Sequence, residues 1–178
     1  MSIRAHLTIF LVLPAALLAQ GEGQSERIAS LQAGIICPPE TVGSAPAPGT
    51  LAGTTHIIDA DPPFVSTERR VPAVLGIGFG IKATAADAAG IDNVTMVVTH
   101  PPMGKTQAQV QSFGTAVSGV STSLTFYQFD YAYELVYGTW EMAAIKDDQT
   151  LYRVRFEVVP PQQVPELAAI CGFEELLS

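Results

Sequence analysis

Residues 134–160, ELVYGTWEMAAIKDDQTLYRVRFEVVP, decide the fold class of this chain. A polar turn at residues 147–149 separates two segments in which large apolar residues alternate with polar or small ones. The apolar set is Trp140, Met142 and Ala144 before the turn, and Tyr152, Val154, Phe156 and Val158 after it. A period of two, with β-branched and aromatic residues, is typical of strands that bury one face. The stretch therefore predicts a β-hairpin whose largest core residue is Trp140.

Other short strand patterns, separated by turn signals, occupy much of the remaining chain. The clearest is Val71–Ala83, where Leu75, Ile77, Phe79 and Ile81 share one face and glycines lie on the other. Glycine inside a strand marks a bulge or the close approach of another backbone. Ser121–Phe129 predicts a strand with Leu124 and Phe126 facing inward.

About seven such strands and no long helix predict an all-β protein. The pattern favours an antiparallel β-sandwich of the immunoglobulin-like or fibronectin-like kind. A closed barrel is the alternative.

Four regions follow from the composition along the chain. Residues 1–19 have the order of a signal peptide: basic Arg4, the apolar run Leu7–Leu18, which is too short to span a bilayer, and small Ala19 for cleavage. We expect residues 20–49 to form an N-terminal extension that ends in a Pro/Gly-rich linker. Residues 50–160 should form the sandwich, and residues 161–178 should form a tail with a short helix. The signal predicts a periplasmic or secreted protein with no membrane span after cleavage.

The chain has two cysteines, Cys37 and Cys171, near the two ends of the mature sequence. In an oxidising compartment two thiols usually pair, which predicts a disulfide that ties both tails to one place. Two separate buried thiols are the alternative.

The charge of the chain excludes some partners. Its formal net charge is −8, whereas a nucleic-acid binder needs a basic surface to neutralise phosphates. An acidic protein is also poorly suited to an anionic membrane surface.

No stretch carries a recognisable catalytic or cofactor-binding motif. GIGFG at 76–80 continues as a strand instead of opening a helix, and MGKT at 103–106 has Thr99 where a phosphate loop needs its first glycine. After the signal only His56 and His100 are histidines, and neither has metal-ligand spacing. Glu134 and Glu141 can be drawn as a glycosidase pair, but nothing distinguishes them from the other acids. We therefore expect no cofactor and no metal.

A candidate partner-binding end follows from the predicted strand order. If successive strands alternate in direction, the loops at 59–70, 100–105 and 130–137 share one end of the sandwich. These loops carry an aromatic and basic set of the residue types enriched in recognition sites: Phe64, Arg69, Arg70, His100, Met103, Lys105, Tyr131 and Tyr133. The alternative is that the aromatic residues cap the core and the arginines pair with Glu68 and Glu134.

Three segments together resemble a known family: PPFVSTERRVPAVLGIGFGIKA (62–83), THPPMG (99–104) and ELVYGTWEMAAIKDDQTLYRVRFEV (134–158). They are similar to the bacterial exported family catalogued as domain of unknown function 3859, over roughly residues 50–160. The resemblance implies an all-β, exported protein and implies no activity.

We therefore expect a non-catalytic module of the bacterial envelope that binds or supports an unidentified envelope protein or small ligand. A hydrolase or metal-dependent enzyme, with a site assembled from loops, is the alternative. A third hypothesis is association through an exposed sheet edge.

Overall fold

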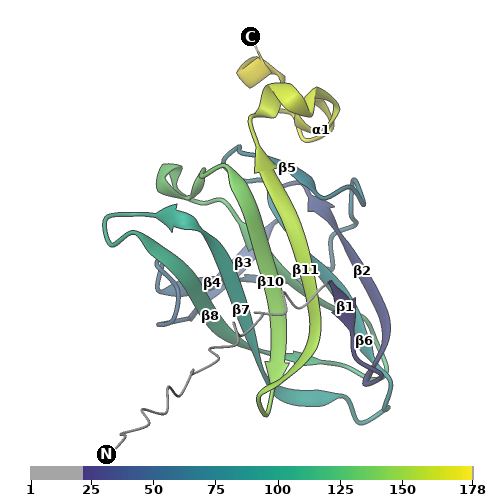
Figure 1. The fold of residues 1–178 in the computed structure, drawn as a ribbon. Helices are drawn as coiled ribbons and strands as arrows, with labels where there is room; N and C mark the ends of the chain where they lie inside the picture. Colours follow the sequence, from purple (N-terminus) through teal and green to yellow (C-terminus); the bar gives the residue numbers. More distant parts are fainter. Residues whose placement is uncertain (1–21, 178) are drawn as a thin grey trace, which may run out of the picture.

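A computed structural model describes residues 22–177, so the predicted signal peptide lies outside the described residues. Two sheets pack face to face (Figure 1), the larger in the order β1-β11-β10-β7-β8 and the smaller in the order β2-β6-β9. β5 runs parallel to the end of β11, and β3 pairs only with β4. The strands are β1 (Gly23–Gln24), β2 (Ile28–Ile36), β3 (Thr41–Pro46), β4 (Thr54–Ile58), β5 (Arg70–Pro72), β6 (Gly78–Ala85), β7 (Ile91–Met103), β8 (Ala108–Val117), β9 (Ser123–Gln128), β10 (Gly138–Lys146) and β11 (Gln149–Val159). The helical turns are η1 (Ala132–Glu134), η2 (Pro161–Gln163), α1 (Pro165–Ile170) and η3 (Glu174–Leu177).

The predicted immunoglobulin-like antiparallel sandwich is confirmed, and its central hairpin is β10–β11. Trp140 lies opposite Phe156, and Lys146 opposite Gln149. Asp147 and Asp148 form the two-residue turn with φ of +50° and +60°. Two consecutive positive φ angles suit the right-handed twist of the strands, and Asp tolerates that conformation.

The core is built around Phe79 of β6, which contacts aromatic rings from both sheets. The Phe156 ring centroid lies 4.8 Å away and the Trp140 centroid 5.7 Å away in an edge-on arrangement. Phe129 and Tyr127 complete the cluster at 5.6 and 5.9 Å. Burying each large side chain contributes about 1.5–3 kcal/mol, so this cluster is the main tie between the sheets.

Two strand predictions are corrected in detail. Val71–Ala83 is not one strand, because β5 and β6 are separated by a turn in which Gly76 has φ of +86° and Leu75 is 45% exposed. β9 presents Thr125, Tyr127 and Phe129 to the core, whereas Phe126 lies beside Gly80 on the opposite face. The inward face of β9 is therefore shifted by one residue from the prediction.

The glycine face of β6 is buried by the close approach of other chain segments, as glycine in a strand indicated. A Cβ on Gly34 of the neighbouring β2 would lie 2.5 Å from the Phe64 ring. Lys82 holds this covering segment, since its Nζ donates to the Pro62 carbonyl at 2.7 Å, pairs with Asp61 at 3.0 Å and lies over the Phe64 ring.

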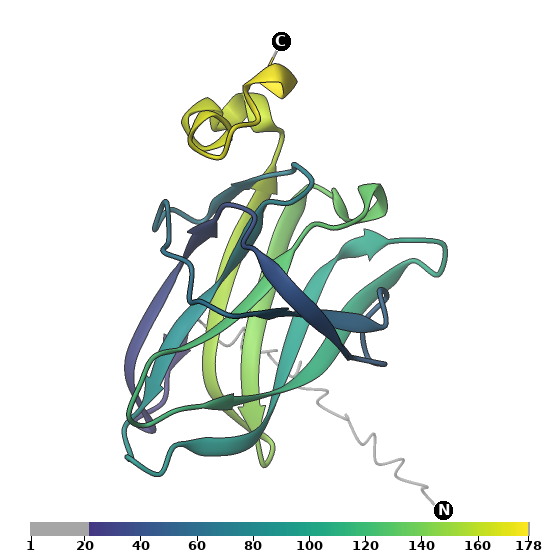
Figure 2. The same cartoon turned by 180° about the vertical axis from the view of Figure 1, so that it is seen from behind.

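The sheets also use residues that precede the predicted sandwich boundary at residue 50. β2 pairs along β6 and buries Ile28, Ile35 and Ile36. The segment predicted as a linker, 38–49, contains β3, and Figure 2 shows the β3–β4 hairpin crossing one side of the sandwich. Short edge strands and this hairpin bring the strands of residues 22–177 to eleven, more than the seven or so expected.

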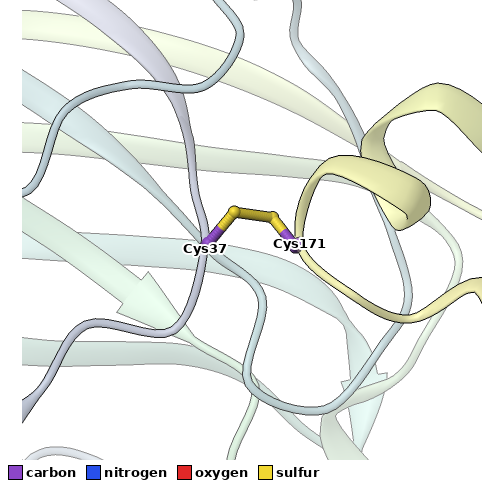
Figure 3. Close-up of a disulfide and its surroundings, with 2 residues drawn as sticks. All are labelled: Cys37 and Cys171. Carbon is purple, nitrogen blue, oxygen red and sulfur yellow. A yellow bond between two sulfur atoms is a disulfide. The ribbon is translucent and has the colours of Figure 1, made fainter.

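The expected disulfide joins Cys37, directly after β2, to Cys171, directly after α1 (Figure 3). The predicted C-terminal helix is α1, which buries Leu167 against the core. The bond spans 134 residues in sequence and pins the C-terminal segment to the end of β2.

Candidate functional site

The residues predicted to form one binding cluster lie in separate places. Tyr131 and Tyr133 stack in parallel, with ring centroids 5.2 Å apart, and both are exposed. They lie beside the turn between β7 and β8 that carries Lys105, because a Cβ on Gly104 would be 3.9 Å from the Tyr133 ring. Met103, the last residue of β7, is buried. The structure therefore brings the tyrosines and this turn together.

Arg69 and Arg70 lie at the start of β5, which pairs with the last residues of β11. Arg69 pairs with Glu22 at 2.8 Å, and Arg70 donates to Gln163 at 2.6 Å. Phe64 covers the outer face of the smaller sheet, and His100 is only 3% exposed. A binding role for this set stays a prediction.

A pocket that the sequence did not indicate lies where the two sheets separate. β8 and β9 are the last strands of their sheets, and between them opens a cavity of about 170 Å³. The β3–β4 hairpin crosses this side of the molecule (Figure 2) and supplies one wall. The lining residues are Thr50, Ala52, Thr54, Thr55 and His56; Gln111, Phe113, Gly114 and Thr115; Leu124, Thr125, Phe126, Tyr127 and Gln128; and Asp130 and Glu134.

A chain of buried polar side chains runs from the core to this pocket. His100 Nδ1 bonds the Pro101 carbonyl at 2.8 Å, so Nδ1 carries the proton and Nε2 accepts from Gln111 Nε2 at 3.2 Å. Gln111 Nε2 also donates to the Tyr127 hydroxyl at 3.2 Å, and that hydroxyl donates to Glu134 Oε1 at 2.7 Å. The chain is continuous from imidazole to carboxylate.

Burial sets the protonation of this chain. It raises the pKa of Glu134, against hydrogen bonds from Tyr127 and from the backbone N–H groups of Tyr131 and Asp130. It lowers the pKa of His100, against the Pro101 hydrogen bond, and raises that of Tyr127. The His100 ring therefore favours its neutral form, and the phenol of Tyr127 keeps its proton.

One side-chain hydrogen bond ties the hairpin to the sandwich at the pocket. His56 Nε2 of β4 lies 2.7 Å from Asp130 Oδ2, just beyond β9. The other carboxylate oxygen of Asp130 accepts from Gln128 Nε2 at 2.9 Å. Gln128 Oε1 is buried and has no hydrogen-bond partner among the described residues. A buried acceptor without a donor is costly.

The carboxylates considered for glycosidase chemistry do not face each other. Glu134 is 2% exposed behind the pocket. Glu141 lies on the outer face of the larger sheet, where it pairs with Arg153 at 2.8 Å and Arg155 at 2.9 Å. Within residues 22–177, no group of three or more His, Cys, Asp or Glu side chains is arranged to hold a metal ion. None of the helices described there has the length and apolar character needed to cross a membrane.

The pocket was missed because its residues come from three separate stretches of the chain, 50–56, 111–115 and 124–134, and none has a motif. One signal was available: Gln111, Thr115, Thr125 and Tyr127 are polar at inward positions of β8 and β9. Polar residues on an inward face indicate either a buried network or a ligand site.

Comparison with known proteins gives a similar solved structure and a family. No curated protein matches the chain. An immunoglobulin-like protein from Pseudomonas aeruginosa, solved as a crystal structure, is 20% identical with a TM-score of 0.48, over 75% of this chain and 95% of that one. The model of the family described as "Domain of unknown function (DUF3859)" matches residues 24–158. The resemblance found in the sequence is thus confirmed over a longer span, and the chain belongs to the DUF3859 family.

Proposed function

We propose that this protein is a non-catalytic binding module of the bacterial envelope, and that its ligand enters the pocket between β8 and β9. The observation that carries the proposal is the pocket where the two sheets separate, beside which the side chains of His56 and Asp130 are each 30% exposed. Polar groups that water can reach in a pocket are also within reach of a ligand.

Binding is favoured over catalysis by how the polar groups are used. The Tyr127 hydroxyl is held protonated by burial and donates to Glu134, which is already bonded by two backbone N–H groups. A nucleophile needs the reverse, a lowered pKa or a base that takes its proton. These groups bond one another, as a structural network does.

The pocket is small and rich in acceptors. Its volume, about 170 Å³, is below the roughly 300 Å³ at which drug-sized ligand sites begin, so it suits one side chain or a comparable group. Asp130 and Glu134 are the acids that line it and His56 is the basic residue. Five threonines also line it: Thr50, Thr54, Thr55, Thr115 and Thr125. The complementary ligand is therefore a neutral or cationic hydrogen-bond donor.

Export is part of this proposal. A disulfide between Cys37 and Cys171 suits an oxidising compartment, and the pattern of residues 1–19 suits a signal peptide. We expect the envelope fraction of cells to yield a protein whose intact mass starts near Gln20. A full-length mass in the cytoplasm would contradict export and leave the binding site untouched.

The site can be tested by filling it. Thr115 lines the pocket, so Thr115→Phe should occupy it, whereas Thr95→Phe places the same ring on the exposed outer face of β7 and serves as the matched control. Ligand-observed NMR with a library of amines, guanidines, amides and polyols should find binders to the wild-type protein and to Thr95→Phe that are lost in Thr115→Phe. Urea unfolding would confirm that both variants fold. The proposal is wrong if no compound binds, or if Thr115→Phe binds as well as the control.

A further inference from the structure

The outer edge of β9 is a row of unpaired backbone groups. Phe129 donates to the Ile77 carbonyl and accepts from the Gly76 N–H, so odd-numbered residues of this segment face β6. Leu124, Phe126 and Gln128 consequently direct their N–H and C=O groups away from β6. The backbone groups of these three residues have no hydrogen-bond partner in the described part of the chain. An edge of this kind is a template for another strand.

The other edges of the two sheets are at least partly covered. β1 and β5 pair with β11, and the Arg155 N–H between them donates to Glu22 Oε1 at 2.7 Å. The edge of β2 bonds the segment at Val65 and Ser66, and β8 receives the Gly49 carbonyl at the Ser112 N–H. Within residues 22–177, β1 and β5 are strands of two and three residues, whereas β9 offers an edge of six residues that no other segment pairs with. This edge borders the pocket.

The pocket extends along this edge. Every residue from Leu124 to Gln128 lines it, so a strand added to β9 would place a side chain at its mouth. Alternate residues of an added strand point to opposite faces, and one position therefore enters while its neighbours do not. Asp130 lines the pocket with a side chain that is 30% exposed, and its carboxylate suits a cationic donor at that position.

We propose that β9 binds an extended segment of a partner protein by strand addition, and that a Lys or Arg side chain of this segment enters the pocket. The inference rests on the proposed function and specifies its ligand. Backbone hydrogen bonds to Leu124, Phe126 and Gln128 would provide affinity, and the pocket would provide the preference for a basic residue.

The test uses fluorescence polarisation with degenerate, labelled pentapeptide libraries that share a fixed central residue. We compare central Lys, Arg, norleucine and Glu, because norleucine keeps the apolar stem of Lys and removes its charge. Libraries with Lys or Arg should bind at least about tenfold more tightly than the norleucine and Glu libraries, since a charge-assisted hydrogen bond is lost in both. N-methylation of the two residues flanking the centre should abolish binding, because it removes the donors that pair with β9.

The outcomes separate this inference from the proposed function. If N-methylated peptides bind equally well but Thr115→Phe prevents binding, the pocket is a ligand site and strand addition is wrong. Equal binding of all four libraries, tighter binding of Glu, or no binding of any library would also overturn the inference. A stable dimer in analytical ultracentrifugation that is abolished by Leu124→Pro but not by Leu124→Ala would show instead that β9 pairs with a second copy, which contradicts a partner segment.

Discussion

The two lateral sides of the sandwich differ in how their strand edges are covered. On one side, β11 and β2 are covered by β1, β5 and residues 65–66, and the disulfide fastens the C-terminal segment there. On the other side, β8 and β9 separate and leave the edge of β9 unpaired. Exposed edges favour unwanted association, and natural proteins usually blunt them. The β3–β4 hairpin crosses this second side without pairing to β9, and a pocket lies between them.

The polarity of the interior also differs between the two sides. Toward the covered side the core is aromatic and aliphatic, with Phe79 and Phe156 fully buried. Toward the open side it holds the polar chain from His100 to Glu134. Trp140 lies between the two, 5.7 Å from Phe79 and 4.7 Å from the His100 ring. Apolar packing therefore supplies most of the stability on one side, while hydrogen bonds fix the geometry on the other.

Removing Trp140 should have the largest effect, because it borders both sides. Trp140→Ala leaves a cavity among Phe79, Phe129 and Tyr127 and should cost roughly 3–5 kcal/mol in urea unfolding. Tyr137→Ala is the matched control, since that ring is 58% exposed and its loss should cost less than about 0.5 kcal/mol. A loss under about 1 kcal/mol at Trp140 would contradict a shared core.

Removing the disulfide tests the covered side alone. For a separation of 134 residues the chain-entropy estimate is about 5 kcal/mol, and we expect Cys37→Ala with Cys171→Ala to cost about 2–4 kcal/mol. The cost is smaller because Val164 and Leu167 still pack the C-terminal segment against the core. Limited proteolysis should then cut near α1 first and leave β8 and β9 intact. Unchanged stability, or first cleavage at β9, would contradict this assignment.

Alternation was sufficient to predict the hairpin, the core position of Trp140 and Phe79, and the fold class. It could not locate the break at Leu75 and Gly76, because Ile77, Phe79 and Ile81 continue the period of Leu75 across the turn. For β9 it assigned the more hydrophobic Leu124 and Phe126 inward. The structure turns Thr125 and Tyr127 inward instead, since Thr125 bonds Thr115 and Tyr127 bonds Glu134. Hydrophobicity is a poor guide where the interior is itself polar.

The candidate pocket was beyond sequence reasoning for a related reason. Gln111, Glu134 and the β3–β4 hairpin meet only because the hairpin folds across the open side, and the segment of β3 has a linker-like composition. The loops at one end were predicted to carry a single cluster. The direction of a strand, however, does not say on which side of a sheet a loop leaves it, and Arg69 is consequently separated from Tyr131 by the width of the larger sheet.

Glu134 on the side of β8 and β9, and Glu22 on the side of β11, allow the two sides to be compared through single residues. Glu134 and Glu22 each accept at least one hydrogen bond from a backbone N–H and one from a side chain. Glu134 is buried, whereas Glu22 is exposed. Glu134→Ala should cost about 2 kcal/mol, because it strands buried donors at Tyr127, Asp130 and Tyr131. Glu22→Ala should cost under about 1 kcal/mol, because water replaces the lost bonds. Equal losses in urea unfolding would mean that the polar chain adds no more stability than a surface pair.

The smallest effect should be a pH dependence that belongs to the open side. Burial lowers the pKa of His100 in the folded protein, so between that pKa and the unfolded value near 6.5 the unfolded chain binds more protons. The contribution of His100 to the free energy of unfolding should therefore be fully present above this window. It should be lost as the pH decreases through the window. Glu134 acts in the opposite direction, because its raised pKa means that its ionisation opposes folding as pH rises above about 4.5. His100→Asn removes the first contribution and keeps the second, and it retains a donor for the Pro101 carbonyl. Urea unfolding from pH 7.5 to 5 should show wild-type stability falling relative to the variant. Parallel curves would show that His100 is protonated as readily when folded as when unfolded, and the polar chain would then not hold its ring in the neutral form.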